Sequence, residues 1–386
     1  MFSPDLVLVG FGNVGRRFVR LLEERADELR GGRQIDWRVV GIATARHGVA
    51  RNSDGLDITR ALDLVERGES LAAIDAPAAG SLASSSLAAS GIELIEQVAE
   101  AARAAGSTRP LVVVETTVLD IAAGQPAIDH VRAGLRAGAH VITANKGPVA
   151  FAYAELAELA RVADRAFLFE GAVMDGIPIF NMVRETLPAV RISGFSGVVN
   201  STTNFIITAM ENGREFAESL AEMQAAGIAE ANASLDVDGW DAAAKASALA
   251  NVLLGAHTTP QQVERTGIGH LTGAAVRAAV ARGNRLKLVA RGERRGAEVI
   301  VRVGVEELPA GHLFATLGGQ QNALQIETDL LGSFAIAQLG GGLTQTAYAL
   351  VTDLVAVAQL EGRDGLSGGS LDDDSIAGSR AAIGFP

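Results

Sequence analysis

The sequence predicts an α/β fold: a doubly wound parallel sheet, followed by a second domain of mixed α+β type. Two observations carry this prediction. Up to about residue 150, short apolar runs alternate with segments of helical spacing, which is typical of parallel strands buried on both faces. Beyond that point, strand-like and helical segments follow each other without this regular alternation.

The first strand and the turn after it indicate a nucleotide site. The apolar run 6–9 leads directly into a glycine-rich turn, and helical spacing follows over 14–22. A GxGxxG turn between a strand and a helix brings backbone N–H groups and the positive helix end to a pyrophosphate. We therefore expect a Rossmann-type domain. Its candidate cofactor-binding residues are Gly10, Phe11, Gly12, Asn13, Val14 and Gly15.

The end of the second strand, 37–43, bears on the choice of cofactor. An NAD site usually carries an acidic residue here, which binds the ribose 2′-hydroxyl. This sequence has none, and Arg46 follows instead. A guanidinium can hold a 2′-phosphate bidentately, which favours NADP, with NAD as the alternative. Arg46 is otherwise an ordinary surface arginine.

Two further strands bring polar residues to the same sheet edge. After an irregular segment over 71–90 and a helix over 92–105, strands are expected over 111–115 and 140–143. The first ends at Thr116, and the second runs into a polar turn that contains Lys146. The carboxyl ends of parallel strands meet beside the cofactor, so Lys146 is a candidate site residue. The alternative is a solvated lysine.

The second half is expected to hold a helix over 152–163 and strands over 190–195, 197–200 and 299–305. Ser-Thr-Thr-Asn at 201–204 precedes an apolar helix and is typical of an N-cap. Its hydroxyl and N–H groups can also bind a carboxylate, which makes Thr202 a candidate.

An acidic stretch, 230–241, leads into a second apolar helix that contains Lys245. Carboxylates suit the ammonium group of an amino-acid substrate. A lysine can stabilise negative charge on an aldehyde oxygen and donate a proton. Asp241 and Lys245 stand four apart and share one helix face. Because the surroundings of Lys245 are apolar, we expect partial burial and a lowered pKa. The alternative is a surface ion pair worth ~0.2–0.5 kcal/mol.

Composition excludes several classes of protein. The 386 residues are 48% hydrophobic, enough for about two domains, and contain no cysteine. The absence of cysteine excludes disulfides, thiolate metal sites and the aldehyde dehydrogenases that form a thioester. The six histidines lack the spacing of zinc ligands. A net charge of −12 suits neither nucleic acid nor anionic membranes. No membrane-spanning run or signal peptide is visible, so the expected location is the cytoplasm.

Six motifs occur in this order: GFGNVG, TANKGPVA, GAVMDGIP, GVVNSTTNFI, AEANASLDVDGWDAAAK and GGGLTQTAYALVTDL. With these motifs, the sequence resembles the homoserine dehydrogenase family over residues 5–358. The resemblance implies reversible NAD(P)-linked interconversion of L-homoserine and L-aspartate 4-semialdehyde, in the biosynthesis of threonine and methionine. It also implies a homodimer.

The resemblance implies roles for single residues. Lys245 and Lys146 match lysines proposed to transfer the proton, and Lys146 also lies beside the nicotinamide. The substrate set is Glu230, Asp241 and Gly227, to which we add Asp236 and Thr202. Asn13, Val14, Thr116 and Gly342 match positions that line the cofactor. A monovalent cation such as Na⁺ would lie against Glu170, Val173, Asp175 and Ile177, mostly on backbone carbonyls.

Some positions depart from the family pattern. Ser201 stands where glycine is typical, and Ile228 where tyrosine is common. Asn232-Ala233 replaces Asp-Pro, and GGLTQT lacks the usual proline. The lysines and acids stay in place, so these changes bear on substrate affinity and choice. Two other functions therefore stay open: an oxidoreductase for another small amino-acid aldehyde or alcohol, and a non-catalytic NADP sensor.

The expected domain organisation has four parts. Residues 1–150 form the nucleotide-binding domain, and 151–338 the catalytic and dimerisation domain. Residues 339–360 return to the first domain, and 361–386 form a flexible tail rich in Gly, Ser and Asp. No regulatory domain is expected after it, nor threonine feedback through one.

Overall fold

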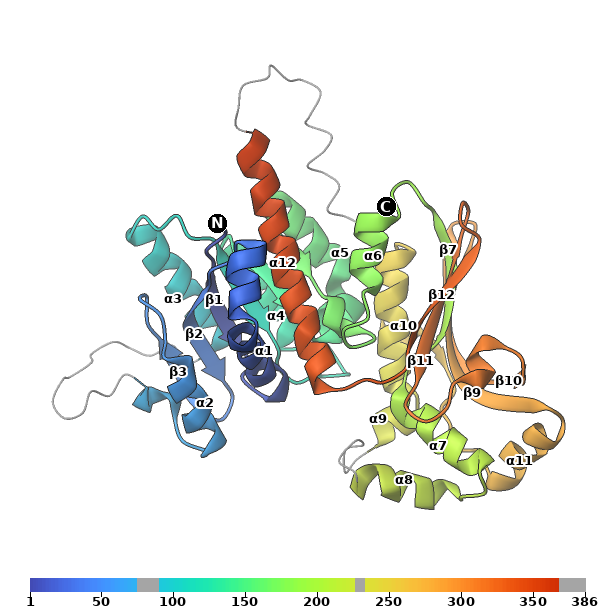
Figure 1. The fold of residues 1–386 in the computed structure, drawn as a ribbon. Helices are drawn as coiled ribbons and strands as arrows, with labels where there is room; N and C mark the ends of the chain where they lie inside the picture. Colours follow the sequence, from blue (N-terminus) through green and yellow to red (C-terminus); the bar gives the residue numbers. More distant parts are fainter. Residues whose placement is uncertain (75–89, 226–232, 368–386) are drawn as a thin grey trace.

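The computed structural model describes residues 1–74, 90–225 and 233–367, with the backbone alone over 363–367. Two six-stranded sheets, with helices packed around and between them, make up the molecule (Figure 1). The predicted α/β class with a Rossmann-type sheet and a second α+β unit is confirmed. Within the described residues, no helix is both long enough and apolar enough to cross a membrane.

The first sheet has the strand order β3-β2-β1-β4-β5-β6. Every neighbouring pair is parallel except β2 and β3, which form a hairpin. Its strands are β1 Asp5–Val9, β2 Arg38–Thr44, β3 Gly48–Arg51, β4 Leu111–Glu115, β5 His140–Thr143 and β6 Phe167–Leu168. The sheet therefore continues past residue 150, the boundary expected between the two domains.

Helices cover both faces of this sheet. They are α1 Asn13–Glu24, α2 Ile58–Glu66, α3 Gly91–Ala104, α4 Ala127–Arg136 and α5 Lys146–Ala163, with short turns at Glu28–Gly32, Leu71–Ala73 and Glu170–Ala172 (η3). Alternate side chains of β1 serve the two faces. Leu6 and Leu8 lie in one core cluster with Phe18 of α1, whereas Val7 and Val9 lie in another with Leu94 of α3.

The second sheet has the strand order β12-β11-β7-β9-β10-β8 and is antiparallel except for the β8–β10 pair. Its strands are β7 Ile192–Val198, β8 Glu264–Arg265, β9 Asn284–Arg295, β10 Glu298–Pro309, β11 Asn322–Thr328 and β12 Ser333–Gln338. Its helices are α6 Ile179–Thr186, α7 Ser201–Glu211, α8 Phe216–Ala225, α9 Ser234–Val237, α10 Trp240–Leu253 and α11 Gly273–Ala281, with turns at Pro260–Gln262 and Leu313–Thr316.

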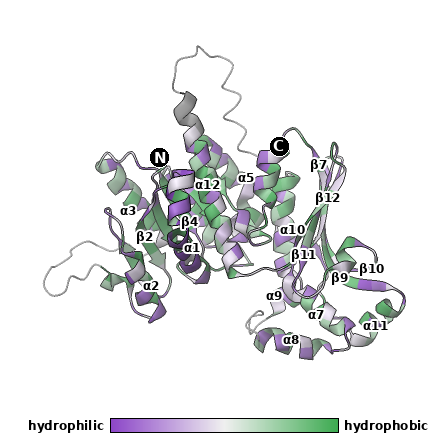
Figure 2. Ribbon diagram, viewed as in Figure 1, coloured by the Kyte–Doolittle hydropathy of each residue, from purple (hydrophilic) through white to green (hydrophobic). Residues whose placement is uncertain are grey.

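Helix α10 lies between the two sheets. It packs on α5 from the first half and on β9 and β10 from the second (Figure 1). All residues from Ala246 to Leu253 are buried, which explains why this part of the helix is almost entirely apolar. Figure 2 shows α10 largely in the hydrophobic colour, whereas the outer helix α8 mixes both colours.

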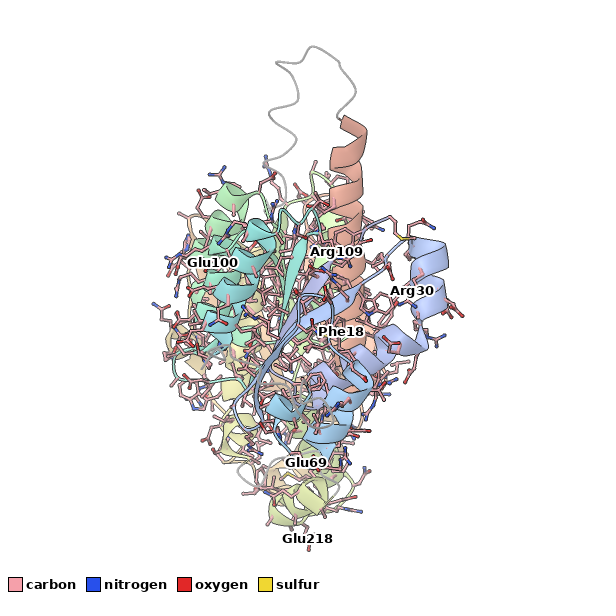
Figure 3. The ribbon with its side chains drawn as sticks, turned by 90° about the vertical axis from the view of Figure 1, so that its left-hand side faces the viewer. Phe18, Arg30, Glu69, Glu100, Arg109 and Glu218 are labelled. Atoms are coloured by element: carbon pink, nitrogen blue, oxygen red, sulfur yellow. The ribbon has the colours of Figure 1, made fainter. Side chains whose placement is uncertain are left out.

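The last helix, α12 Leu343–Ser367, returns to the first sheet and packs along α1 (Figure 1). Leu350 and Leu354 are fully buried there, in the cluster that contains Phe18. Figure 3 shows Phe18 inside the molecule beside this helix. The helix continues to Ser367, past residue 360, where a flexible tail is expected.

Three predicted boundaries are wrong for local reasons. The strands expected over 190–195 and 197–200 are one strand, β7. The turn expected at Lys146 is the first turn of α5, because the side chain of Asn145 accepts a hydrogen bond from Gly147 N–H and caps the helix. Likewise α7 begins at Ser201 because Asn200, rather than residues 201–204, is its N-cap.

Candidate active site

The glycine-rich turn has the shape that a dinucleotide needs. Gly10 has φ +95°, and a Cβ there would lie 2.6 Å from the backbone of Thr116. The Thr116 hydroxyl donates to Gly10 O at 2.8 Å, so the β1 and β4 turns support each other. No atom lies within 4 Å of the Cβ position of Gly12, the N-cap of α1. Space is therefore open in front of uncapped helix N–H groups.

Other candidate cofactor residues surround this turn. Phe11 points into the core, so only its backbone faces the turn, and Val14 packs against the same cluster. The side chain of Asn13 accepts from Arg16 at 2.8 Å. Arg46 is exposed in the β2–β3 turn, three residues after Ala43, whose carbonyl accepts from Gly10 N–H.

Glu115, at the end of β4, organises the two neighbouring strand ends, a role that sequence reasoning missed. The carboxylate is fully buried and accepts from Thr117 N–H at 2.8 Å and from the Thr143 hydroxyl at 2.6 Å. The Asn145 amide donates to Thr117 O at 3.0 Å. The turns that carry Thr116 and Lys146 are thus fixed to each other. An acid at the end of an apolar strand was the only signal for this in the sequence.

Two lysines share one carboxylate between the sheets. Lys146 Nζ, from the start of α5, lies 3.1 Å from Asp241 Oδ1. Lys245 Nζ, one turn after Asp241 on α10, lies 3.2 Å from Asp241 Oδ2 and donates to Val199 O at 2.7 Å. The three side chains are each 16–19% exposed. The cluster is therefore sheltered yet open to a ligand.

Asn200 joins this cluster to a second acid. Its amide donates to Asp236 Oδ1 at 2.6 Å and to Asp241 Oδ2 at 2.9 Å, while its oxygen accepts from Thr203 N–H. Thr202 also hydrogen-bonds Asp236. The structure thus brings together five predicted residues: Lys146, Thr202, Asp236, Asp241 and Lys245. Asn200 was missed because it was expected as the last residue of the strand 197–200.

The charges in the cluster shift the acid–base properties of its members. Burial opposes ionisation of Asp241, but Lys146 and Lys245 outweigh it and hold the carboxyl pKa well below its usual range. Burial also disfavours the Lys245 ammonium, but Asp241 and then Asp175 outweigh it, so the Lys245 pKa is raised. The lowered pKa expected for Lys245 is therefore wrong. Burial and the charge of Asp241 raise the Asp236 pKa.

Two predicted substrate residues, Gly227 and Glu230, lie outside the described residues, as does Ile228. Gly342 is exposed immediately before α12, and its carbonyl accepts from Thr346 N–H.

The segment matched to a cation site follows β6. The Glu170 carboxylate accepts from Phe180 N–H at 2.9 Å and Asn181 N–H at 2.6 Å. Burial, with the nearby Asp353 carboxyl, raises the pKa of Glu170 to about 8. Val173 is buried, and Ile177 O already accepts from Ile179 N–H. Among the described side chains, no group of three or more His, Asp or Glu could hold a metal ion.

The fold and the site together define a class of protein: a nicotinamide-dependent oxidoreductase with lysines at the carboxyl edge of a Rossmann-type sheet. Comparisons with known proteins identify the family. Residues 10–170 match the model described as homoserine dehydrogenase, NAD binding domain, and residues 178–355 match the homoserine dehydrogenase model.

Characterised relatives cover nearly the whole chain. An NAD(+)-dependent homoserine dehydrogenase of Pseudomonas canavaninivorans is 33% identical over 361 residues, which are 93% of this chain and 97% of the relative. The homoserine dehydrogenase of Methanocaldococcus jannaschii is 32% identical over 354 residues, 92% and 98% of the two chains.

Solved structures agree. A putative homoserine dehydrogenase from Archaeoglobus fulgidus superposes with a TM-score of 0.76 at 27% identity, covering 93% of this chain and 99% of the other. The structure of a homoserine dehydrogenase from Thiobacillus denitrificans gives a TM-score of 0.75 at 29% identity, covering 95% of this chain and 76% of the other. The chain belongs to the homoserine dehydrogenase family, whose members are oxidoreductases that act on a CH–OH group.

Proposed function

We propose that this chain catalyses the reversible oxidation of L-homoserine to L-aspartate 4-semialdehyde with a nicotinamide cofactor, a step that supplies threonine and methionine. One observation carries the proposal beyond family membership. Lys146 and Lys245 share Asp241 at the edge of the sheet that holds the glycine-rich turn. A non-catalytic nucleotide sensor has no use for this arrangement.

The residues fit a dinucleotide. The open space at Gly12 and the uncapped start of α1 accept a pyrophosphate, and Thr116 supports the turn from β4. Val14, Asn13 and Gly342 complete the proposed cofactor side. When bound, the cofactor exchanges a hydride with the carbon that carries the substrate oxygen. Every other part of the chemistry falls to side chains of the protein.

In our mechanism the lysines stabilise and protonate the substrate oxygen, and the acids bind the substrate amino group. Asp241 lies beside both lysines and its charge raises the Lys245 pKa, so an aldehyde oxygen meets the Lys245 ammonium, which stabilises its growing negative charge. Lys245 then donates the proton. In the oxidative direction the neutral amine of Lys245 accepts it, which its raised pKa disfavours near neutral pH. Asp236 and Asp241, with Glu230, bind the substrate ammonium, and Thr202 and Gly227 its carboxylate end.

We further propose a preference for NADP, because Arg46 is exposed at the β2 end without an acid nearby in the turn. Arg46→Ala should raise KM for NADP⁺ and leave KM for NAD⁺ unchanged, since only NADP⁺ carries the 2′-phosphate. Steady-state kinetics with both cofactors measure this. An equal change in KM for NADP⁺ and for NAD⁺ would show that Arg46 does not bind the 2′-phosphate.

Two expectations from the resemblance, and one from the sequence pattern, remain proposals. We propose a Na⁺-type cation on the carbonyls of Glu170, Val173, Asp175 and Ile177. We also propose a homodimer and a cytoplasmic location.

The reaction is tested by following reduced nicotinamide while the purified protein meets L-homoserine and NADP⁺ or NAD⁺. Reduction should require homoserine and fall by ~10²-fold or more in Lys245→Ala, the usual contribution of a general acid–base. Lys146→Ala should also lose activity. A normal kcat in Lys245→Ala would mean that Lys146 or a water molecule transfers the proton instead. Cofactor binding without turnover of homoserine would favour the sensor or another amino-acid alcohol.

A further inference from the structure

A line of side-chain hydrogen bonds runs from the second sheet to helix α12, which packs on the first. Asn322, at the start of β11, donates to Ser201 Oγ at 2.7 Å and to Gln338 Oε1 at 3.0 Å. Gln338, at the end of β12, donates to Asp175 Oδ2 at 2.8 Å. Thr346 of α12 donates to Asp175 Oδ1 at 2.9 Å. We call these five side chains the inter-sheet clasp.

The clasp is sheltered from water and closely packed. Asn322 and Gln338 are each 2% exposed, so their amides depend on these partners. A Cβ on Gly341 would lie 2.6 Å from both Asp175 Oδ2 and Gln338 Nε2. A Cβ on Gly176 would lie 2.5 Å from Gln345 O. The turn before α12 therefore passes directly over the Gln338–Asp175 bond and has room only for glycine there.

One end of the clasp reaches the proposed substrate site. Ser201 is the first residue of α7 and follows Asn200, which holds Asp236 and Asp241. Asp175 also acts on this site directly, because its charge contributes to the raised pKa of Lys245. The clasp is thus joined through Ser201 to Asn200, which bonds both acids, and Asp175 lies close enough to influence Lys245.

The other end reaches the helix of the glycine-rich turn. Thr346 lies in the first turn and a half of α12, and Thr344, two residues earlier, accepts a hydrogen bond from Arg17 Nε of α1 at 3.1 Å. Helix α12 packs along α1 over much of its length. A displacement of the start of α12 would therefore move the turn 340–342 against the cofactor side of the site.

We propose that the inter-sheet clasp sets the position of the cofactor-side turn relative to the substrate site, and that Gln338 is its central positioning residue. The inference rests on the proposed function, because it concerns the alignment of hydride donor and acceptor. Gln338 touches neither ligand in this scheme. It acts by joining Asn322 of the second sheet to Asp175, which in turn accepts a hydrogen bond from Thr346 at the start of α12. Ser201, where the family typically has glycine, supplies an extra link that glycine lacks.

The proposal predicts a specific kinetic defect. Gln338→Met keeps the length of the side chain but removes the bonds to Asn322 and Asp175. Because hydride transfer needs close alignment, kcat should fall by about 10-fold or more. The KM for homoserine and the Kd for NADPH should change little, since the binding groups remain. With homoserine deuterated at the reacting carbon, the isotope effect on kcat should rise as hydride transfer becomes rate-limiting.

A milder pair of variants controls for folding. Thr346→Val removes only the bond to Asp175 from a partly buried position and should show the same pattern, to a smaller extent. Thr352→Val makes the same change on the same helix, but its hydroxyl bonds to Ala349 O within α12. This control should keep the wild-type kcat and isotope effect. A lower melting temperature in Gln338→Met with normal kcat and isotope effect would overturn the proposal.

A readout without turnover separates this inference from the proposed function. The amides of Gln345 and Thr346 bond to Gly342 O at the start of α12. Their hydrogen exchange should be faster in Gln338→Met and Thr346→Val, and unchanged in Thr352→Val. If the wild-type protein fails to oxidise homoserine, the proposed function is lost while faster exchange still supports the clasp. Unchanged exchange in both clasp variants would contradict it.

Discussion

At the scale of single residues, the site depends on one carboxylate that serves two lysines. Asp241 lies within 3.2 Å of the Nζ atoms of both lysines, and its charge raises the pKa of Lys245. This differs from an exposed i,i+4 pair on a helix, which would contribute only a few tenths of a kcal/mol. Here the same spacing places a proton donor beside a sheltered negative charge.

The pH dependence of catalysis should report this carboxylate. Asp241 raises the Lys245 pKa, so Asp241→Asn lowers it, and the neutral amine becomes available at lower pH. The rise of kcat with pH for homoserine oxidation should therefore shift to lower pH in Asp241→Asn. The profile is measured at saturating homoserine, so that the expected loss of substrate affinity in Asp241→Asn does not affect it.

The matched control is Asp238→Asn, the same change on an exposed acid nearby. Its profile should overlay the wild-type profile. A profile for Asp241→Asn that also overlays it would mean that Lys245 is not the group whose ionisation limits oxidation.

At the scale of elements, three helix ends meet at the site. α5 begins at Lys146, α7 at Ser201 and α10 at Trp240, one residue before Asp241. The caps of α5 and α7 are asparagines, Asn145 and Asn200, that also bond to the site or to its supporting turns. The element boundaries and the active-site geometry are therefore set by the same side chains.

Asn200→Ala should affect stability and catalysis together. The change removes the cap of α7 and leaves Asp236 and Asp241 without a shared donor, so the free energy of unfolding should fall by about 1–3 kcal/mol. Urea unfolding and kcat measure the two effects. Asn212→Ala, at the exposed C-terminal end of the same helix, should change neither. A normal kcat in Asn200→Ala would show that the acids hold their positions without it.

The sequence predicted the strands and the lysines at this scale, but not the caps. Apolar runs and glycine spacing depend on local pattern, which a sequence displays. Whether Asn145 ends a turn or begins a helix depends on whether its side chain meets Gly147 N–H, a matter of three-dimensional geometry. The roles of Glu115 and Asn200 depend on partners 28 and 41 residues away. Such pairings are invisible in one sequence.

At the scale of the whole molecule, stability and chemistry lie at opposite edges of the first sheet. Asp5, at the start of β1, is 6% exposed and accepts from Arg38 at 2.6 Å and from Arg109 at 2.7 Å. The glycine-rich turn and the lysine turn both follow the carboxyl ends of strands, away from Asp5.

Asp5→Asn should therefore weaken the fold without slowing the reaction. The free energy of unfolding should fall by about 1–2 kcal/mol, because the negative charge and one acceptor oxygen are lost while both guanidinium groups still reach water. Asp36→Asn, in the exposed pair with Arg30, should cost less. Urea unfolding ranks the two variants. A lower kcat in Asp5→Asn with an unchanged free energy of unfolding would contradict the view that this end of the sheet serves stability alone.

The return of α12 has a consequence for how the protein is made. On the ribosome, Leu6, Leu8 and Phe18 are synthesised first, but Leu350 and Leu354, which cover them, are synthesised more than three hundred residues later. At about 5–20 residues per second, this face of the nascent sheet waits many seconds for its cover. The nucleotide half therefore cannot finish folding as an independent unit on the ribosome. Its core is completed only after the second sheet has emerged.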